Sequence, residues 1–289
     1  MISHEPSAMS QAPSARCGTP TNYLTVDVED YFQVAAFEDV IPPDSWEQYE
    51  CRVSSNTGSI LELFASCNVK ATFFIVGWIA ERYPDLVLEI NRQGHEIGCH
   101  SYRHQKIYDL TPEQFREDTR RAKEILEQII DKPVYGYRAP SYSITKKSLW
   151  ALDILAELGF RYDSSIFPVY HDNYGIPDAP RFAYRLEKQN MKEYPISTVQ
   201  FPGVNLPIAG GGYFRLFPYW FTRMALRRIN RKEQQPFIFY LHPWEVDPGQ
   251  PRVDGAGAKS RFRHYLNLDK TRNRLERLLQ DFSFGPITG

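Results

Sequence analysis

Long apolar runs are missing from this chain of 289 residues. A membrane-spanning helix needs about 20 consecutive apolar residues, and no stretch approaches that length. The first 20 residues are polar and rich in serine and proline, without the basic start and apolar centre of a secretory signal peptide. We therefore expect no stable membrane insertion, a disordered leader over residues 1–20 and a cytoplasmic location.

Net charge and cysteine are scarce as well. The 34 basic and 35 acidic residues leave a net charge of −1, which gives no electrostatic reason to expect binding to nucleic acid or to an anionic membrane. The four cysteines show no CxxC spacing, which predicts reduced thiols. Cys99 alternates with Ile97, so we interpret it as a small buried residue rather than a metal ligand. No Gly-Lys-Ser/Thr follows the glycines at 210–212, so a phosphate-binding loop is not expected there.

Predicted strands and helices alternate over the first 165 residues. This alternation favours parallel strands with crossover helices, in a barrel or an open sheet. Functional side chains should then lie at the C-terminal ends of the strands. The strands are expected at residues 23–30, 69–77, 96–99, 134–138 and 160–163, and the helices at 58–66, 78–93, 111–130 and 145–158.

The second half of the chain is less regular. Residues 167–212 are rich in proline, tyrosine and glycine and are expected to form loops. A helix at 217–230, a strand at 236–244 and a closing helix at 266–279 are predicted, with a mobile Pro/Gly-rich stretch at 249–260.

His100 and His104 have the spacing of a pair of metal ligands. On one helical turn, residues four apart lie on the same face, so both rings could reach one ion while a carboxylate from elsewhere completes the set. Two surface histidines are the alternative interpretation. His95 has no partner at this spacing and is interpreted as a structural or surface residue.

Other polar residues stand at the ends of predicted strands. Taken singly, each has an ordinary structural explanation. Arg138 could form a surface ion pair, Asp163 could start a turn, and His242 could be a hydrogen-bonded core residue. The set of strand-end residues is Asp27, Glu29, Asp30, His100, His104, Arg138, Asp163 and His242.

Together these residues resemble the ordered motifs of the polysaccharide deacetylase family, also known as the NodB-homology or carbohydrate esterase family 4 enzymes. The motifs span about 220 residues: Thr25-Val26-Asp27, His100-Ser101-Tyr102-Arg103-His104, Arg138-Ala139-Pro140, Asp163-Ser164-Ser165 and Leu241-His242. Residues 27–32, 171–177 and 210–215 further resemble the branch linked to exosortase and exopolysaccharide loci.

The resemblance implies an α/β fold, a distorted (β/α) barrel with about seven strands. It implies a single domain over residues 21–289, including a C-terminal extension from about residue 245. The implied activity is metal-dependent hydrolysis of the N-acetyl group of an amino sugar in a polysaccharide or its lipid-linked precursor. The implied cofactor is a divalent metal ion, zinc with cobalt or nickel as alternatives. The expected partner is an N-acetylated glycan, and the sequence predicts no oligomeric state.

The chemistry explains these residue types, because amide hydrolysis needs an activated water, a base and an acid for the leaving amine. By resemblance, His100 and His104 are metal ligands, Asp27 is the base and His242 is the acid. Arg138 would orient Asp27 and keep it ionised.

The resemblance implies two further contributions. Asp163 would fix the side of the site that holds Arg138 and His242. A backbone N–H after Pro140 would face the oxyanion, although Ser141 stands where the family usually has an aromatic residue.

The first motif departs from the usual pair of adjacent aspartates, so its metal ligand has two candidates. Strand alternation places Glu29 on the face of Asp27, whereas a turn after Val28 would bring in Asp30. We favour Asp30, because its arm is shorter and the family's ligand is usually aspartate. Two other functions stay open: hydrolysis of a small non-carbohydrate amide, and glycan binding without catalysis. The filled base and acid positions disfavour the latter.

Overall fold

The structure is a computed structural model that describes residues 20–171 and 174–287. The predicted leader lies outside the described residues, apart from Pro20. The described chain forms a nine-stranded sheet around strand β1 (Asn22–Val28). The order of the main path is β10 (Ile238–Leu241), β1, β2 (Thr72–Ile75), β3 (Glu96–Cys99), β4 (Gly136–Tyr137), β5 (Tyr162–Asp163), β7 (Met191–Glu193) and β6 (Tyr184–Leu186).

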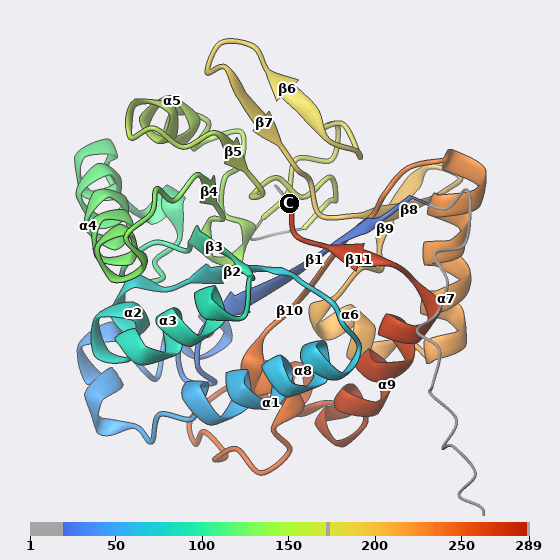
Figure 1. The fold of residues 1–289 in the computed structure, drawn as a ribbon, viewed down its shortest axis with the longest axis horizontal. Coiled ribbons are helices and arrows are strands. Elements are labelled where there is room, and N and C mark those ends of the chain that lie inside the picture. The colour runs from blue at the N-terminus through green and yellow to red at the C-terminus, as the bar shows by residue number, and fades with distance from the viewer. Residues whose placement is uncertain (1–19, 172–173, 288–289) are drawn as a thin grey trace, which may run out of the picture.

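The strands from β10 to β7 are parallel and β6 is antiparallel. The short strand β11 (Phe284–Gly285) pairs with the start of β1. The sheet curls, with helices around its outside (Figure 1), and no strand pair joins β6 to β10 in the described part of the chain. This confirms the predicted distorted barrel in a single domain.

Nine α-helices occur in the described residues, and several differ from the prediction. The helix expected at 78–93 is two helices, because Pro84 has no N–H to continue the first and starts the second. Residues 198–207 form a hairpin, and α8 begins inside the stretch expected to be mobile. The helices are α1 (Val53–Ser66), α2 (Gly77–Arg82), α3 (Pro84–Arg92), α4 (Pro112–Ile130), α5 (Trp150–Glu157), α6 (Gly211–Leu216), α7 (Tyr219–Arg228), α8 (Ala258–Tyr265) and α9 (Leu268–Asp281), and the hairpin pairs β8 (Thr198–Phe201) with β9 (Val204–Pro207).

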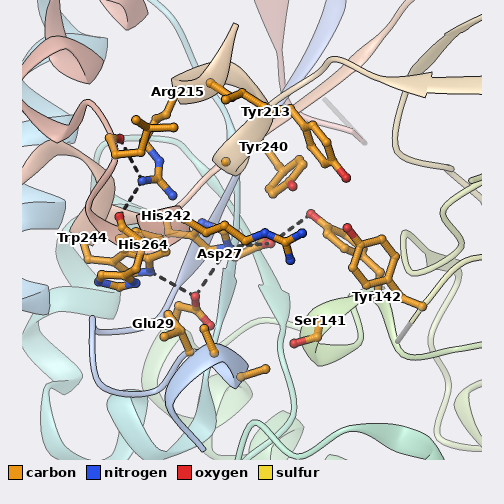
Figure 2. A pocket seen from close by; sticks show the side chains of 18 of the residues that line it. Asp27, Glu29, Ser141, Tyr142, Tyr213, Arg215, Tyr240, His242, Trp244 and His264 are labelled. Atoms are coloured by element: carbon orange, nitrogen blue, oxygen red, sulfur yellow. Dashed lines mark hydrogen bonds and ion pairs between the residues drawn. The ribbon is translucent and has the colours of Figure 1, made fainter. Parts of the chain in front are cut away.

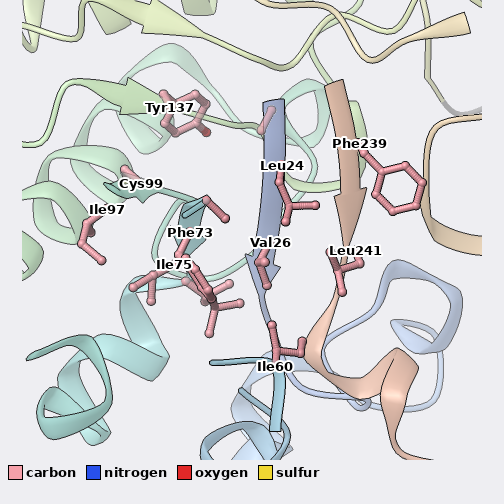
Figure 3. Close-up of a cluster of buried hydrophobic side chains, with 14 of the residues drawn as sticks. Leu24, Val26, Ile60, Phe73, Ile75, Ile97, Cys99, Tyr137, Phe239 and Leu241 are labelled. Carbon is pink, nitrogen blue, oxygen red and sulfur yellow. The ribbon is translucent and has the colours of Figure 1, made fainter. Parts of the chain in front are cut away.

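The two faces of the sheet carry separate apolar clusters, because side chains alternate along each strand. Leu24 and Val26 of β1 and Phe73 of β2 belong to the larger cluster, which includes buried residues of the outer helices (Figure 3). Phe74 and Tyr240 belong to a second, more aromatic cluster. Thr25 and Asp27 alternate with Leu24 and Val26, so they are on the face of the second cluster, where the candidate site forms.

The described cysteines, Cys51, Cys67 and Cys99, are free thiols, and Cys99 is fully buried as predicted. Across residues 20–171 and 174–287, none of the helices combines the length and apolar character that crossing a membrane requires.

Candidate active site

The predicted strand-end residues gather at one edge of the sheet. Asp27 lies at the end of β1 and Asp163 ends β5. His100, Arg138 and His242 directly follow β3, β4 and β10. Because these strands are parallel, their C-terminal ends meet at the same edge, which brings residues far apart in sequence together.

Arg138 is the buried centre of one half of the site. Its guanidinium Nη1 donates to Asp27 Oδ1 at 2.6 Å and to Thr25 Oγ1 at 2.8 Å. Its other nitrogens donate to the carbonyl and the hydroxyl of Ser164, and the group lies 4.3 Å from the centre of the Phe74 ring. Burial opposes the charge of Arg138, but Asp27 outweighs it and raises the pKa of this guanidinium. The hydrogen bonds to Thr25 and Ser164 fix the guanidinium, and its bond to Oδ1 holds Asp27 in a position facing the pocket.

Glu29 lies with His100 and His104 in a cluster whose ligand atoms are all within 4.8 Å of one another. His104 Nε2 is 2.6 Å from Glu29 Oε2, and Trp244 donates to Glu29 Oε1 at 3.1 Å. His100 Nδ1 is 2.7 Å from the carbonyl oxygen of Arg138. This contact occupies Nδ1, so Nε2 is the ring nitrogen left to bind a metal ion. Two imidazoles and one carboxylate are a donor set that zinc binds in proteins.

The electrostatics of this cluster suit a cation. Burial opposes ionisation of Glu29, but His104 and His242 outweigh it and hold the pKa of this carboxyl well below its usual value. Burial lowers the pKa of His100 to about 4, so its ring is neutral near pH 7. Nδ1 of His104 is buried and has no hydrogen-bond partner in the structure. An anionic carboxylate beside a neutral imidazole therefore fits a divalent metal ion.

The two histidines do not share a helical turn, so the predicted geometry was wrong. They lie in a loop in which Ser101 and His104 have φ angles of 60° and 52°. Asp118 on α4 accepts hydrogen bonds from the backbone N–H groups of Tyr102 and Arg103 at 2.7 and 3.0 Å. This anchoring from another element, which the sequence pattern did not reveal, brings the two rings to 5.0 Å between centroids.

Asp30, the favoured metal ligand, does not lie with the histidines. Its Oδ2 accepts hydrogen bonds from the backbone N–H groups of Arg52 and Val53 at 2.6 and 2.8 Å and from Cys51 Sγ. Its Oδ1 accepts from Tyr31 N. The carboxylate thus caps the start of α1, and this capping explains why α1 begins five residues before the predicted start. Glu29, the alternative, is the carboxylate beside the histidines.

His242 is held by a residue that the sequence analysis missed. Its Nδ1 is 2.6 Å from Glu245 Oε1, and Glu245 accepts from Arg215 Nε at 2.8 Å. Its Nε2 lies 3.5 Å from Glu29 Oε1 and 3.9 Å from Asp27 Oδ2. The available signal was the acid three residues after His242, since Glu245 also accepts from the His242 backbone N–H, as in a capping box.

The charges around His242 favour its protonated form. Burial opposes protonation, but the carboxylates of Glu29, Glu245 and Asp27 raise the pKa of His242 to about 9. Arg215 and His242 in turn outweigh burial and lower the pKa of Glu245. The three carboxylates thus favour a cationic imidazole at neutral pH, and the hydrogen bond of Nδ1 to Glu245 leaves Nε2 facing the pocket.

Among the described residues, Asp163 forms no direct hydrogen bond or ion pair with Arg138 or His242. Arg138 is held by Ser164, and His242 by Glu245. Asp163 instead accepts from the hydroxyl of Ser165, which accepts from the backbone N–H of Ala139. Asp163 therefore reaches the segment that carries Arg138 only through the hydroxyl of Ser165. His95 is also separate from the site: it is buried, and its Nδ1 accepts from the backbone N–H of Ala71.

A pocket of about 580 Å³ contains both halves of the site. Figure 2 shows Asp27, Glu29 and His242 facing it, with Tyr142, Tyr213 and Tyr240 around it. Tyr142 OH lies 3.5 Å from Asp27 Oδ2. Ser141, the residue after Pro140, also lines the pocket. The aromatic walls are suited to stacking on a sugar ring.

The C-terminal segment, predicted as an extension, is part of this pocket. The rings of His242 and Trp244 are stacked with centroids 5.2 Å apart, and Trp244 is stacked on His264 at 4.2 Å. His264 belongs to α8, which also contributes other lining residues. The site is therefore built from both halves of the chain.

Two family patterns match the chain. Residues 36–162 match polysaccharide deacetylase, and residues 164–289 match a domain of unknown function (DUF3473). The chain is 34% identical over 98 residues to a peptidoglycan-N-acetylglucosamine deacetylase of Bacillus cereus, a stretch covering 34% of this chain and 36% of that protein. It is 29% identical over 108 residues to a chitooligosaccharide deacetylase of Azorhizobium caulinodans, covering 37% of this chain and 50% of that protein.

A peptidoglycan deacetylase of Helicobacter pylori is 26% identical over 152 residues, covering 51% of this chain and 50% of that protein. The matched stretches thus span between about a third and a half of these relatives. A crystal structure from Mycobacterium smegmatis, described provisionally as a polysaccharide deacetylase, shares the fold with a TM-score of 0.61 at 19% identity, covering 98% of this chain and 93% of that one. Residues 36–162 therefore match the polysaccharide deacetylase family, in agreement with the ordered strand-end motifs, and the structure from Mycobacterium smegmatis shares the fold.

Proposed function

We propose that the protein is an N-deacetylase that hydrolyses the N-acetyl group of an amino sugar in a glycan or its lipid-linked precursor. One observation carries the proposal: Asp27 and His242 face the same pocket beside the Glu29–His100–His104 cluster. Amide hydrolysis needs a proton acceptor and a proton donor on either side of the reacting carbon. This arrangement supplies both next to a metal-type donor set.

Glu29, His100 and His104 are proposed to hold a divalent metal ion, zinc with cobalt or nickel as alternatives. Such an ion would polarise the acetyl carbonyl and lower the pKa of the attacking water. The chain's own contribution to that step is the neutral imidazole of His100, directed by the Arg138 carbonyl, and the anionic carboxylate of Glu29.

Asp27 is proposed as the base that takes a proton from the attacking water. Its Oδ1 is bound by Arg138, so Oδ2 is the atom available toward the pocket.

His242 is proposed as the acid that protonates the leaving amine. Glu245 occupies Nδ1, so Nε2 is the donating atom. The raised pKa, about 9, keeps the ring protonated at neutral pH before the reaction. The backbone N–H of Ser141, in a segment that lines the pocket, is proposed to face the oxygen that becomes negatively charged.

The comparisons favour a glycan over a small amide as the substrate. The relatives act, by their names, on peptidoglycan or chitooligosaccharide, and the pocket has aromatic walls. The exosortase-linked branch is part of this proposal on the motif resemblance alone, which includes Tyr174 and Arg215, two residues of the pocket wall.

Metal removal tests the mechanism. Protein stripped with a chelator should lose acetate release from N-acetylated oligosaccharides and regain it with zinc, cobalt or nickel. Added magnesium, which prefers oxygen ligands, serves as the control. Full activity after complete metal removal contradicts the mechanism.

Substitution of the base tests the catalytic assignment. Asp27→Asn should lower kcat by about 100-fold or more while the protein keeps its metal, because a positioned base contributes about 10²- to 10⁴-fold. Glu187→Gln, at an exposed position, is the control. If Asp27→Asn releases acetate with an unchanged kcat, the assignment of Asp27 as the base is wrong.

A further inference from the structure

Two cationic side chains at the pocket have no task in the proposed reaction. Lys259 and Arg263 both line the pocket and are exposed. They are four residues apart on α8, which places them on the same face of that helix. Their charge therefore faces the space that a bound substrate would occupy.

These cations have no charged or hydrogen-bonding partner in the part of the chain that the structure describes. Neither Lys259 nor Arg263 forms an ion pair or hydrogen bond with another described residue. By contrast, Arg138 and Arg215 are buried and bound to Asp27 and Glu245. The other carboxylate of the pocket, Glu29, is already matched by His104 and His242. Neither carboxylate among the described lining residues, Asp27 or Glu29, is thus paired with the two cations.

The helix that carries them is fixed against the reaction centre. His264, next to Arg263, is buried and stacked on Trp244. Arg215 Nη1 donates to the carbonyl oxygens of His264 and Leu266 at 2.6 and 3.1 Å. The two cations therefore stand at a set position relative to His242, as a recognition site for a substrate group requires.

The wall beside the cations is aromatic. Phe262, on α8, lines the pocket with 61% of its surface exposed. Tyr174 lines the pocket and is close enough for the positive charge of Arg263 to affect its hydroxyl. Rings beside cations match a sugar unit that carries an oxyanion, because the sugar face can stack while the charge is bound.

We propose that Lys259 and Arg263 bind an oxyanion on the sugar unit next to the N-acetyl group, so that the substrate is an acidic rather than a neutral glycan. The inference rests on the proposed deacetylase function and specifies its substrate class. A carboxylate of a uronic acid and a phosphate share this chemistry, and Arg263 can bind either one through two parallel N–H groups.

The test compares three matched N-acetylated oligosaccharides: neutral, with a neighbouring uronic acid, and with a phosphate on the neighbouring unit. The wild type should have a higher kcat/KM for at least one acidic substrate. Lys259→Gln combined with Arg263→Gln should lower that kcat/KM by about tenfold or more, and leave the neutral substrate within about twofold. Arg261→Gln, also exposed on α8 but outside the pocket lining, should match the wild type for all three.

Binding separates the failure of this inference from the failure of the proposed function. Calorimetry on zinc-loaded Asp27→Asn protein should show tighter binding of the acidic oligosaccharide, weakened by salt and by the double substitution. Such binding without acetate release from any substrate by the wild type would overturn the deacetylase function and leave the anion site standing. Equal binding and equal turnover of neutral and acidic substrates would overturn the anion site. A response to only one acidic substrate identifies the oxyanion.

Discussion

Glu29 and Asp30 are neighbours, but their carboxylates serve different parts of the molecule. Glu29 contacts His104 and Trp244 in the pocket, and Asp30 binds the first N–H groups of α1. Adjacent side chains at the end of an extended strand point to opposite faces. A single step along the chain therefore separates a candidate ligand from a helix cap.

Substitution of each acid should have a different consequence. Glu29→Gln should lower zinc affinity by about 100-fold or more, because even an outer-shell partner costs about 10- to 100-fold, with a small effect on stability. Asp30→Asn should keep zinc affinity but reduce the free energy of unfolding by about 1 to 2 kcal/mol, because it weakens the cap of α1. Zinc titration and urea unfolding measure the two quantities. Lost zinc binding in Asp30→Asn alone would reverse the assignment.

The carboxyls of Asp163 and Glu193 form a buried pair at the ends of β5 and β7. Burial raises the pKa of Asp163 to about 6 and, together with the charge of Asp163, raises that of Glu193 well above its usual value. A raised folded-state pKa means that the folded state binds the proton more tightly. The contribution of Asp163 to the free energy of unfolding is therefore fully present below about pH 4, and it is lost as the pH rises through about 6.

Removing one charge of this pair should flatten the pH dependence of stability. Wild-type protein should lose free energy of unfolding between about pH 5 and pH 8, and Glu193→Gln should lose less and be the more stable of the two at about pH 8. The amide oxygen can still accept from Ile166 N, as Glu193 does. Urea unfolding at several pH values, with Glu187→Gln as the exposed control, measures the effect. If the free energy of unfolding of Glu193→Gln falls more steeply with pH than that of the wild type, the prediction is wrong.

At the scale of elements, Arg138 depends on how closely β2 and β3 approach. Gly98 in β3 leaves room for the Phe74 ring, since a Cβ at Gly98 would lie 2.5 Å from Phe74 Cδ1. The same ring lies under the Arg138 guanidinium. The glycine in β3 thus indirectly sets the position of the group that holds Asp27.

Adding one methyl group at Gly98 should disturb both packing and catalysis. Gly98→Ala should reduce the free energy of unfolding by about 1 to 3 kcal/mol and lower kcat, because Phe74 must move under Arg138. Gly58→Ala is the matched control, since Gly58 lies inside α1 with open space around it. That substitution should stabilise the protein by about 0.5 to 1 kcal/mol without changing kcat. If Gly98→Ala changes neither the free energy of unfolding nor kcat, then Phe74 does not transmit strain to Arg138.

At the scale of the whole molecule, the two family patterns meet between residues 162 and 164, but the sheet runs through both. Strand β1 pairs with β2 on one side and with β10, from the second half, on the other. The site also draws Asp27 from one half and His242 from the other. The main sheet is shared by both halves, and only the small β8–β9 hairpin stands apart from it, so we expect the two halves to fold as one unit.

Unfolding should therefore occur in a single calorimetric transition with equal calorimetric and van't Hoff enthalpies. Phe239→Ala, at a fully buried position of β10, should lower the midpoint of this one transition, with a cost of about 3 to 5 kcal/mol. Trp220→Ala, at an exposed position, should change stability by less than about 0.5 kcal/mol. Two resolved transitions, with only one shifted by Phe239→Ala, would contradict the single unit.

The sequence by itself determined the alternation of strands and helices, the strand-end positions of the polar residues and the resemblance to the polysaccharide deacetylase family. These features are local, since hydrophobic periodicity and short motifs are written in neighbouring residues. The π turn after α7 (Ile229–Glu233) and the division of the helix at Pro84 are refinements of that local pattern.

Only the tertiary structure decided which groups meet. Glu29 rather than Asp30 lies with the histidines, Glu245 rather than Asp163 holds His242, and α8 brings two cations to the pocket. Each depends on contacts between residues far apart in the chain, such as the Asp118 carboxylate under the histidine loop. No periodicity encodes such contacts, because the path of a loop is set by its distant hydrogen-bond partners as well as by its own residues.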